Sequence, residues 1–437
     1  MEHKTGIRNS FKAKVLVQIQ RMLSAIQCSE ERYKEMINIP TYIEKDAVSN
    51  HAADIARLGT KALIVTGRSS AKANGALRDI TEVLDSTGTK YEIFDGISEN
   101  PPVSEIMSAR SLGISKGCDF VIGIGGGSPM DAAKAVSLLL FYNKEKEDFL
   151  YEKPDKTSGR AELDDYGQTI CFPVICIPTT CGTGSEATGV SVLSRVDLRT
   201  KVSLPHRVYP SLALLDPTYL MYAPYKVLRN TAIDAMAHMI ESYINTAATA
   251  ESKALCIEGL KLWSKGKDVI IGKRRVGYVR DEHPENVTDY IRRKNDPEKA
   301  AAEDITDMKI LEDMLKASNI AGKAIAITGT SLPHALSYRL TFEANVAHGP
   351  ATGIFQPGFI SHADEKTQKE LFRAMDFRGL EDFKEFLGRS CDIGEITDLE
   401  YSIILENSIK DILKAPERIA KVPYPVDREV LESIVTA

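Results

Sequence analysis

The sequence predicts two domains in one chain: an α/β N-terminal domain with a Rossmann-like parallel sheet, and an all-α C-terminal domain. Up to about Asp216-Pro217, short β-rich runs alternate with helical patterns, which is typical of parallel βαβ units. After that point long periodic helices replace the β-branched runs. The length of 437 residues also exceeds what one hydrophobic core normally serves. We therefore expect an N-terminal extension at 1–35, an α/β domain at 36–216 and a helical domain at 217–437.

Four segments of the first half have the apolar, β-branched composition of buried strands: residues 62–66, 91–94, 120–124 and 173–177. A helical pattern at 71–87 separates the first two segments. Strands and helices that alternate in this way form a parallel sheet that binds ligands at the carboxyl ends of its strands. We therefore expect ligand-binding loops directly after these strands.

Long helical patterns occupy residues 229–245, 305–328 and 365–387 of the second half. Between the first two, the charged segment at 265–303 is interpreted as a solvated insertion, with a specific binding role as the alternative. In residues 1–27, apolar side chains recur at helical spacing and five basic residues accompany one acidic residue. This pattern predicts an amphipathic helix, which could dock on its own subunit or a neighbour, direct the chain to a partner or compartment, or form an organelle presequence.

The composition excludes several kinds of partner. A net charge of −6 offers no basic surface for nucleic acid. Seven cysteines without a CxxC pair argue against a disulfide framework or a structural zinc site, and indicate the cytoplasm. No run approaches the ~20 apolar residues of a membrane-spanning helix. We expect a cytoplasmic protein with neither nucleic acid nor membrane as a partner.

The third predicted strand breaks into glycines at 125–127 and restarts as a helix after Ser128. Glycines let the backbone approach an anion closely, and a helix N-terminus directs unpaired N–H groups toward it. The pattern indicates a phosphate-binding loop. A purely steric need for glycine at a strand-to-helix turn is the alternative.

A second group of residues has the chemistry of a metal site. Asp234 and His238 are four residues apart in a helix-compatible segment, so both side chains leave the same helical face. His334 and His348 follow, and the four together offer one carboxylate oxygen and three imidazole nitrogens. This set suits Fe(II) or Zn(II), with Mn(II), Co(II) and Ni(II) also open, and leaves positions for a substrate. A single histidine in an apolar helix would more often be a core or surface group.

These motifs, in this order, resemble those of the iron-dependent (group III) alcohol dehydrogenase family. The resemblance covers about residues 36 to 430 and rests on 125–128 with Asp131 and Lys134, 178–188, 215–217, Asp234 with His238, His334 and 348–349. It implies the two-domain architecture shared with dehydroquinate synthase and a homo-oligomer. Because the glycine loop and the metal motifs lie in different halves, we expect the active site between the domains.

The resemblance also assigns roles to residues. It implies that Asp234, His238, His334 and His348 bind the metal, with Fe(II) as the natural ion and Zn(II) as a substitute. The implied site for the dinucleotide phosphates comprises Gly126, Gly127, Ser128 and Asp131. Further positions along the cofactor are Asn100, Thr179, Thr180, Thr188 and Lys201.

One position departs from the family pattern. In many members a histidine four residues after the third ligand is suspected of relaying a proton, and here that position is Tyr338. A histidine relay is therefore in doubt. Tyr338 could instead shape the pocket or reach the cofactor ribose.

Cofactor preference is predicted from the turn after the first strand, which reads Gly67, Arg68, Ser69 and Ser70. An acidic residue here would bind the adenosine ribose and repel a 2′-phosphate, whereas small hydroxyls and a cation would accept one. The turn therefore favours NADP over NAD. The alternative is that Arg68 only points to water.

The resemblance implies a metal-dependent alcohol dehydrogenase or aldehyde reductase that transfers a hydride between a nicotinamide cofactor and a small primary alcohol or aldehyde. The alternatives are a dehydroquinate-synthase-like lyase or a polyol dehydrogenase of the same superfamily, and a non-catalytic scaffold that keeps the fold. The four-residue metal set and the glycine loop argue against a scaffold, because folding alone requires neither.

Overall fold

The computed structural model describes residues 39–155, 160–164, 167–195, 197, 200–277 and 297–436, and of 297–305 it describes the backbone only. The helix predicted within the extension at 1–35 lies outside the described residues. So do residues 278–296 of the charged segment predicted as an insertion at 265–303.

The first half is built on a parallel sheet of six strands in the order β1-β8-β5-β4-β2-β3. A separate antiparallel pair, β6 with β7, follows the fifth strand of the chain. The strands are β1 (Thr41–Ile43), β2 (Lys61–Gly67), β3 (Lys90–Ile97), β4 (Phe120–Gly125), β5 (Val174–Pro178), β6 (Val192–Arg195), β7 (Thr200–Ser203) and β8 (Leu212–Leu215).

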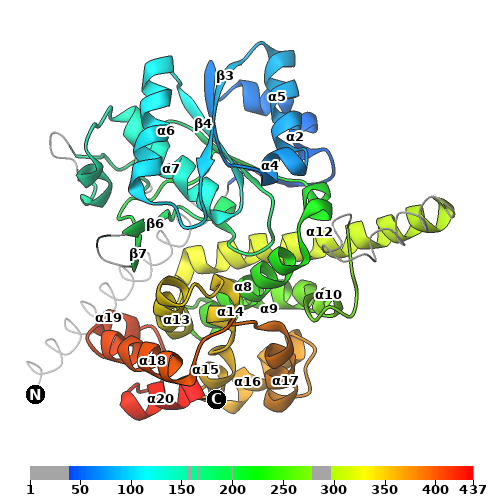
Figure 1. Ribbon diagram of the computed structural model, residues 1–437, viewed down its shortest axis with the longest axis vertical. Coiled ribbons are helices and arrows are strands. Elements are labelled where there is room, and N and C mark those ends of the chain that lie inside the picture. Colours follow the sequence, from blue (N-terminus) through cyan, green and yellow to red (C-terminus); the bar gives the residue numbers. More distant parts are fainter. Residues whose placement is uncertain are drawn as a thin grey trace, which may run out of the picture.

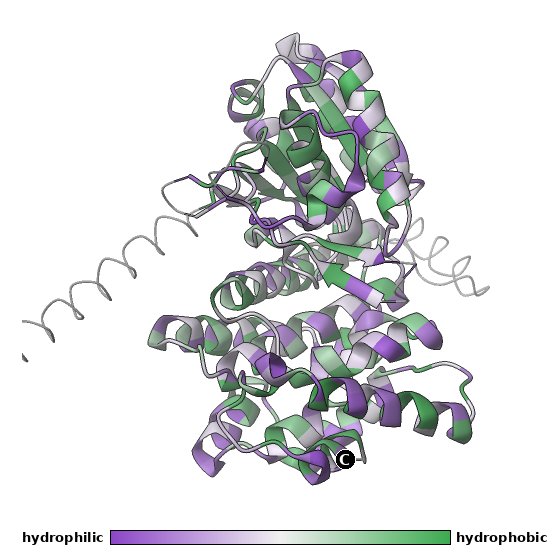
Figure 2. Cartoon of the chain, turned by 90° about the vertical axis from the view of Figure 1, so that its left-hand side faces the viewer, coloured by the Kyte–Doolittle hydropathy of each residue, from purple (hydrophilic) through white to green (hydrophobic). Residues whose placement is uncertain are grey.

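Helices cover both faces of this sheet (Figure 1). α6 (Val103–Lys116) and α7 (Gly127–Phe141) pack on one face, and α2 (Ala47–Asn50), α3 (Ala52–Ala56) and α5 (Ala76–Thr87) pack on the other. Alternate residues of β2 serve the two faces: Leu63 and Val65 join the core under α6 and α7, whereas Ala62 and Ile64 join the other. Because both faces are buried, the strands are hydrophobic along most of their length, as Figure 2 shows.

In the described part of the second half, every regular element after β8 is a helix. The helices pack around one large hydrophobic core. They are α8 (Tyr225–Ile244), α9 (Ala250–Ser264), α10 (Lys267–Ile270), α12 (Pro297–Thr328), α13 (Leu332–Glu343), α14 (His348–Gly353), α15 (Gln356–Ser361), α16 (Glu365–Ala374), α17 (Leu380–Ser390), α18 (Asp398–Leu413), α19 (Pro416–Ile419) and α20 (Arg428–Thr436), preceded by the 3-10 helix η3 (Pro217–Tyr222).

Two predicted helices are each divided in the structure. The helix expected at 71–87 is α4 (Ser70–Ala73) followed by α5, because Gly75 between them has a φ of +88°. The helix expected at 365–387 is α16 followed by α17, and Asp376 between them has a φ of +59°. A left-handed residue cannot continue a right-handed helix.

The topology places two loops where a ligand is expected. From β2 the chain goes to β3 at the sheet edge and then returns to β4 on the other side of β2. The strand order therefore reverses between β2 and β4, and the loops after these two strands begin at that point. In open α/β sheets, ligands bind in the crevice at such a reversal.

The two halves meet along α12, which runs across the molecule below the sheet domain (Figure 1). α12 packs against the 3-10 helix η2 (Ser185–Ala187) in the loop after β5. A Cβ added to Gly322 of α12 would lie 2.4 Å from the Gly184 carbonyl oxygen, and the Asn319 amide donates to Glu186 Oε1 at 3.0 Å. In the described chain, no helix has both the length and the apolar character needed to cross a membrane.

Candidate active site

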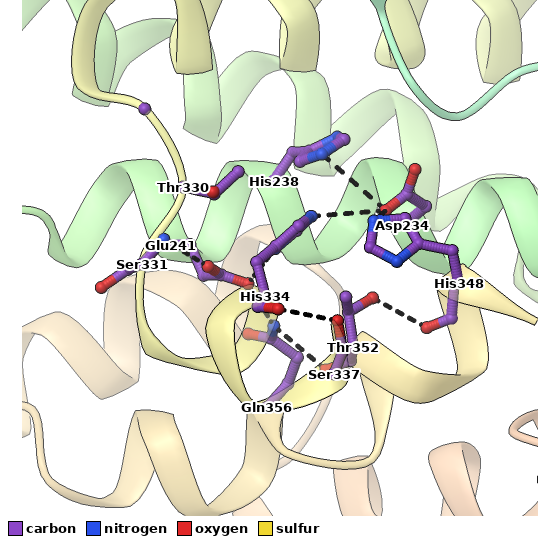
Figure 3. A network of polar contacts seen from close by, with 12 residues as sticks. Asp234, His238, Glu241, Thr330, Ser331, His334, Ser337, His348, Thr352 and Gln356 are labelled. Carbon is purple, nitrogen blue, oxygen red and sulfur yellow. Dashed lines mark hydrogen bonds and ion pairs between the residues drawn. The ribbon is translucent and has the colours of Figure 1, made fainter. Parts of the chain in front are cut away.

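Three helices bring the four predicted metal ligands together (Figure 3). Asp234 and His238 project from one face of α8 and are buried. His334 lies in the first turn of α13 and is also buried, and His348 is the first residue of α14 with 28% of its side chain exposed. The one partly exposed ligand gives the group an open side.

The donor atoms converge on one carboxylate oxygen. Asp234 Oδ1 lies 3.5 Å from Nε2 of His334, and 3.8 Å from Nε2 of both His238 and His348. Donor atoms of Asp234, His334 and His348 all lie within 4.8 Å of one another, and the His238 ring stacks on the His334 ring at 4.6 Å. Ligands bound tetrahedrally at about 2.1 Å from an ion would be about 3.4 Å apart, so the group needs little adjustment to hold one.

Gly349 explains how His348 reaches this group. A Cβ at this position would lie 1.8 Å from the carbonyl oxygen of Asn230 on α8. Only glycine therefore allows the first turn of α14 to lie directly against α8. That contact sets His348 beside Asp234.

A bound cation would satisfy atoms that the protein leaves without partners. In the described part of the chain, Asp234 Oδ1 and His334 Nε2 are buried and form no hydrogen bond. Buried polar atoms are rarely left this way. A carboxylate and three imidazoles suit Fe(II) or Zn(II), so the residues present fit the predicted metal.

Electrostatics favour an ionised Asp234, and they raise the pKa of one of the three histidines while lowering the pKa of the other two. Burial opposes ionisation of Asp234, but His238, His348 and His334 together hold the pKa of its carboxyl below the ordinary value. Burial lowers the pKa of His348 to about 3 and also lowers that of His238, with Asp234 opposing both shifts. Burial alone would lower the pKa of His334, but Glu241 and Asp234 raise it to about 9.

The glycine loop lies at the N-terminus of α7. Gly125 has a φ of +143°, and a Cβ on it would lie 2.8 Å from the Pro129 ring. A Cβ on Gly127 would lie 2.8 Å from Cγ2 of Thr183, and one on Gly126 would lie 3.4 Å from Thr180. The steric reason for glycine therefore holds at Gly125 and Gly127, whereas a Cβ on Gly126 would make only an ordinary contact. This steric reason is compatible with an anion site, because the helix N-terminus is free of a side-chain cap.

Polar contacts order the surroundings of this loop. Ser128 Oγ accepts a hydrogen bond from the backbone N–H of Asn100 at 3.1 Å. Both oxygens of Asp131 are engaged, since Oδ1 accepts from Ser185 Oγ at 2.6 Å and Oδ2 from the Val192 amide at 2.9 Å. Asp131 therefore holds the loop after β5 in place. Buried Lys134 does the same by donating to the carbonyl oxygen and hydroxyl of Ser185 at 2.8 Å.

The remaining predicted cofactor residues lie around this loop or near it. The Thr179 amide donates to the Gly125 carbonyl at 2.8 Å; Thr179 and Thr188 are buried, and Thr180 is half-buried beside Gly126. Burial lowers the pKa of Lys201 on β7, opposed by the carboxylates of Asp234, Glu99 and Asp131. Lys201 is thus within electrostatic reach of both the metal ligands and the glycine loop.

Two family models match the chain: that of iron-containing alcohol dehydrogenases at residues 40–217, and that of their C-terminal domain at 295–415. A solved iron-containing alcohol dehydrogenase is 31% identical, with a TM-score of 0.70 over 91% of this chain and 96% of that one. The chain belongs to the iron-containing alcohol dehydrogenase family. The predicted fold class is confirmed.

Other relatives in this family include the long-chain-alcohol dehydrogenase 1 of Geobacillus thermodenitrificans, which is 26% identical over 90% of this chain and 93% of that relative. The lactaldehyde reductase of Escherichia coli K12 is 26% identical over 74% and 73%. The alcohol dehydrogenase structure from Thermotoga maritima is 31% identical with a TM-score of 0.70, over 90% and 96%. Membership makes this chain a metal-dependent alcohol dehydrogenase or aldehyde reductase, and none of the relatives named here supports a lyase or a scaffold.

Tyr338, the departure from the pattern of this family, lies beside the predicted metal ligands. Its ring is nearly parallel to that of His348, with 6.5 Å between the two ring centroids. The guanidinium of Arg418 lies 5.4 Å from the centroid of the Tyr338 ring. Burial raises the pKa of Tyr338, with Arg418 opposing. Tyr338 therefore contributes a largely apolar ring surface next to the ligand group.

The turn predicted to select the cofactor has an acidic neighbour that sequence reasoning missed. Asp95, at the end of the adjacent strand β3, pairs with Lys72 at 2.5 Å. Lys72, and to a smaller degree Arg68, hold the pKa of Asp95 below its ordinary value. The register of β2 and β3 could have indicated this proximity, since Gly67 pairs with Ile97.

Sequence reasoning also missed a buried polar group behind the ligands. Glu241 on α8 accepts hydrogen bonds from His334, Ser331 and Gln356 (Figure 3). A signal was present: Asp234, His238 and Glu241 follow one another at spacings of four and three, which places all three on one face of α8.

Proposed function

We propose that Asp234, His238, His334 and His348 bind Fe(II), with Zn(II) as a substitute when iron is scarce. The observation that carries this proposal is the approach of three imidazole nitrogens to Asp234 Oδ1 at 3.5–3.8 Å in a buried setting. When bound, the cation supplies Lewis acidity toward an alcohol or carbonyl oxygen, and a nicotinamide supplies or accepts the hydride. Zinc binds nitrogen sites more tightly than Fe(II) does. The metal found in a purified sample therefore depends on which metals were available during expression as well as on the preference of the site.

The dinucleotide site is proposed at the loops where the strand order reverses. Gly126, Gly127 and Ser128 would hold the phosphates at the start of α7, and Asp131 would act by fixing the loop that carries Ser185. Asn100, Thr179, Thr180, Thr188 and Lys201 are proposed to lie along the cofactor. The electrostatic reach of Lys201 toward both Asp131 and Asp234 supports an active site shared by the two halves.

The proposed substrate is a small primary alcohol or its aldehyde, and the Tyr338 ring is proposed to shape its pocket. The lactaldehyde reductase and long-chain alcohol dehydrogenase among the relatives support this reaction class. A panel of alcohols and aldehydes of two to six carbons, assayed by the absorbance of the reduced nicotinamide with and without Fe(II), tests it. A clear preference for a phosphorylated acid would contradict the proposal.

His238→Ala tests the metal assignment. We expect this variant to lose both bound metal and turnover, because it removes one of the four proposed donors. Metal content is measured by elemental analysis and turnover by nicotinamide absorbance. A variant that keeps stoichiometric metal would show that His238 is not a ligand.

NADP(H) is proposed as the preferred cofactor. Gly67, Ser69 and Ser70 leave room for a 2′-phosphate and Arg68 could pair with it, although Asp95 nearby competes for Arg68. Charge-assisted hydrogen bonds contribute about 1.5–3 kcal/mol, which is a preference of about ten- to a hundredfold.

Gly67→Asp tests this preference. A Cβ at position 67 meets only the Ile97 carbonyl at 3.4 Å, so the substitution fits. The new carboxylate should shift the ratio of kcat/KM values toward NAD(H) by binding the ribose and repelling a 2′-phosphate. An NAD(H)-selective native enzyme, or an unchanged ratio in the variant, would show that this turn is not the determinant.

We also propose a cytosolic location, a homo-oligomer and a docking role for the N-terminal extension. Six free cysteines among the described residues support a reducing, cytosolic location. Homo-oligomerisation and docking of the N-terminal extension on a partner or compartment rest on the sequence alone. Light scattering of the full chain, and of a chain that lacks residues 1–35, tests both.

A further inference from the structure

Glu241 is a carboxylate enclosed on all sides by the protein. It lies on α8, one turn after His238, and is fully buried. A buried carboxylate is costly unless hydrogen bonds satisfy it. Three donors do so here: the Ser331 amide reaches Oε2 at 2.6 Å, and His334 Nδ1 and Gln356 Nε2 reach Oε1 at 2.6 and 3.0 Å.

These contacts fix the tautomer of His334. An ionised carboxylate only accepts hydrogen bonds, so the nitrogen of His334 that faces it must carry a proton. In the neutral imidazole that a metal ligand requires, a proton on Nδ1 leaves the lone pair on Nε2. That atom lies 3.5 Å from Asp234 Oδ1 and forms no hydrogen bond within the described structure. Glu241 therefore points the basic nitrogen of His334 at the ligand group.

Gln356 adds a second constraint. Its Nε2 donates to the same Oε1 that His334 uses, and also to the Thr352 carbonyl at 3.4 Å. With its carbonyl oxygen turned toward Glu241 instead, two acceptors would face each other, so the amide orientation is determined. Ser331, the residue that precedes α13, and Gln356, the first residue of α15, thus both hold Glu241 in one position.

We propose that Glu241 is a positioning residue of the metal centre: it fixes His334 as the Nδ1-protonated tautomer and thereby sets how tightly the site binds its metal. The inference rests on the proposed function, because it requires that His334 is a ligand. A carboxylate behind a ligating histidine orients the ring and raises its basicity, and its loss typically weakens metal binding by about 10- to 100-fold.

Glu241→Gln tests the inference with little change in volume. A glutamine has one acceptor and one donor group where Glu241 offers two acceptors. If its NH₂ faces His334, the tautomer reverses and Nε2 carries a proton. If its NH₂ faces Ser331 instead, two donors oppose each other and the negative charge behind His334 is still lost. Either way, affinity for Co(II) and Zn(II), measured by competition with a chelator, should fall by about 10- to 100-fold.

Ser242→Ala is the matched control. Ser242 is the next residue of α8, is fully buried, and accepts a side-chain hydrogen bond from Thr328 on α12, which is not one of the four proposed ligands. We expect this variant to keep the metal affinity and the visible spectrum of the Co(II)-loaded native protein. Glu241→Gln should change that spectrum, because the ligand field reports the orientation of His334.

The outcomes separate the inference from the proposed function. A native protein that binds no metal contradicts the metal site itself. A native protein that binds metal, together with a Glu241→Gln variant of equal affinity and spectrum, overturns only the role of Glu241. If Glu241→Gln does not fold, Glu241→Asp decides, since it keeps the charge and withdraws it from His334. Reduced affinity with an altered Co(II) spectrum then supports the role, and native values overturn it.

Discussion

Glu186 shows how one buried side chain can make stability depend on pH. It lies in η2, is 1% exposed, and accepts a hydrogen bond from Asn319 on α12. Burial raises the pKa of its carboxyl above the ordinary 4.5, with Asn319, Lys134 and Lys323 opposing. The folded protein therefore binds this proton more tightly than the unfolded chain does. Stability associated with Glu186 is fully present below pH 4.5 and declines as the pH rises through the folded-state pKa.

Glu186→Gln should remove this dependence. The amide keeps an acceptor for Asn319 without a buried charge, so we expect the free energy of unfolding to rise by about 1–3 kcal/mol at neutral and higher pH. The gain should vanish as the pH approaches 4.5. Thermal unfolding across this pH range measures it. Glu82→Gln, at a position with 70% of its side chain exposed, is the control and should show no such trend. A gain that does not change with pH would contradict the assignment to Glu186.

At the scale of elements, the contact of α14 with α8 decides whether the ligand group forms. Gly349→Ala would place a methyl group 1.8 Å from the Asn230 carbonyl oxygen, which the two helices can relieve only by moving apart. Because His348 is the preceding residue, we expect this variant to lose bound metal and to be destabilised by about 1–3 kcal/mol, the range for overpacking. Elemental analysis and thermal unfolding are the measurements.

Gly388→Ala is the control for this prediction. Gly388 lies inside α17, and a Cβ there meets no atom within 4 Å. Alanine is favoured over glycine in a helix by about 1 kcal/mol, so this variant should be slightly more stable and keep its metal. Equal metal content in the two variants would show that the close approach of α14 does not hold His348 in place.

The sequence predicted helices and strands best where the composition or periodicity of a single segment was sufficient to identify the element. The strand expected at 120–124 is β4, and the helix expected at 305–328 lies within α12. β1 and β8 were missed because they have only three and four residues and pair chiefly with each other and with β5. Left-handed Gly75 and Asp376 divide two predicted helices, and apolar periodicity does not report such local backbone geometry.

In the candidate site, too, local sequence patterns did not predict contacts between segments that are far apart in the chain. Asp234 and His238 could be paired from their spacing, since one helix carries both. Their meeting with His334 and His348 was predicted with the help of the family resemblance, because these come from separate helices. The spacing of Glu241 places it on the face of α8 that carries Asp234 and His238, but spacing alone gives it no partner. Its role becomes visible only when Ser331 and Gln356, which are 90 and 115 residues further along the chain, are packed against it.

At the scale of the whole molecule, the two halves are joined where α12 meets the loop after β5. Gly322 on α12 and Gly184 in that loop approach so closely that a Cβ on Gly322 would lie 2.4 Å from the Gly184 carbonyl oxygen. The next residue of the loop, Ser185, bonds to Asp131 and Lys134 of α7. A change on a helix of the second half can therefore reach the proposed nucleotide site of the first half through direct contacts.

Gly322→Ala should separate nucleotide binding from metal binding. The added methyl group displaces the 184–186 loop and loosens its hold on Asp131, so we expect weaker nucleotide binding and a lower unfolding temperature. The four proposed metal ligands lie on α8, α13 and α14, so metal content should be unchanged. Nucleotide Kd by fluorescence titration and metal content by elemental analysis distinguish the two effects. Lys316→Ala, at a half-exposed position of α12, is the control and should alter neither. Metal loss in Gly322→Ala with native nucleotide affinity would show that the contact between the halves serves the metal ligands instead.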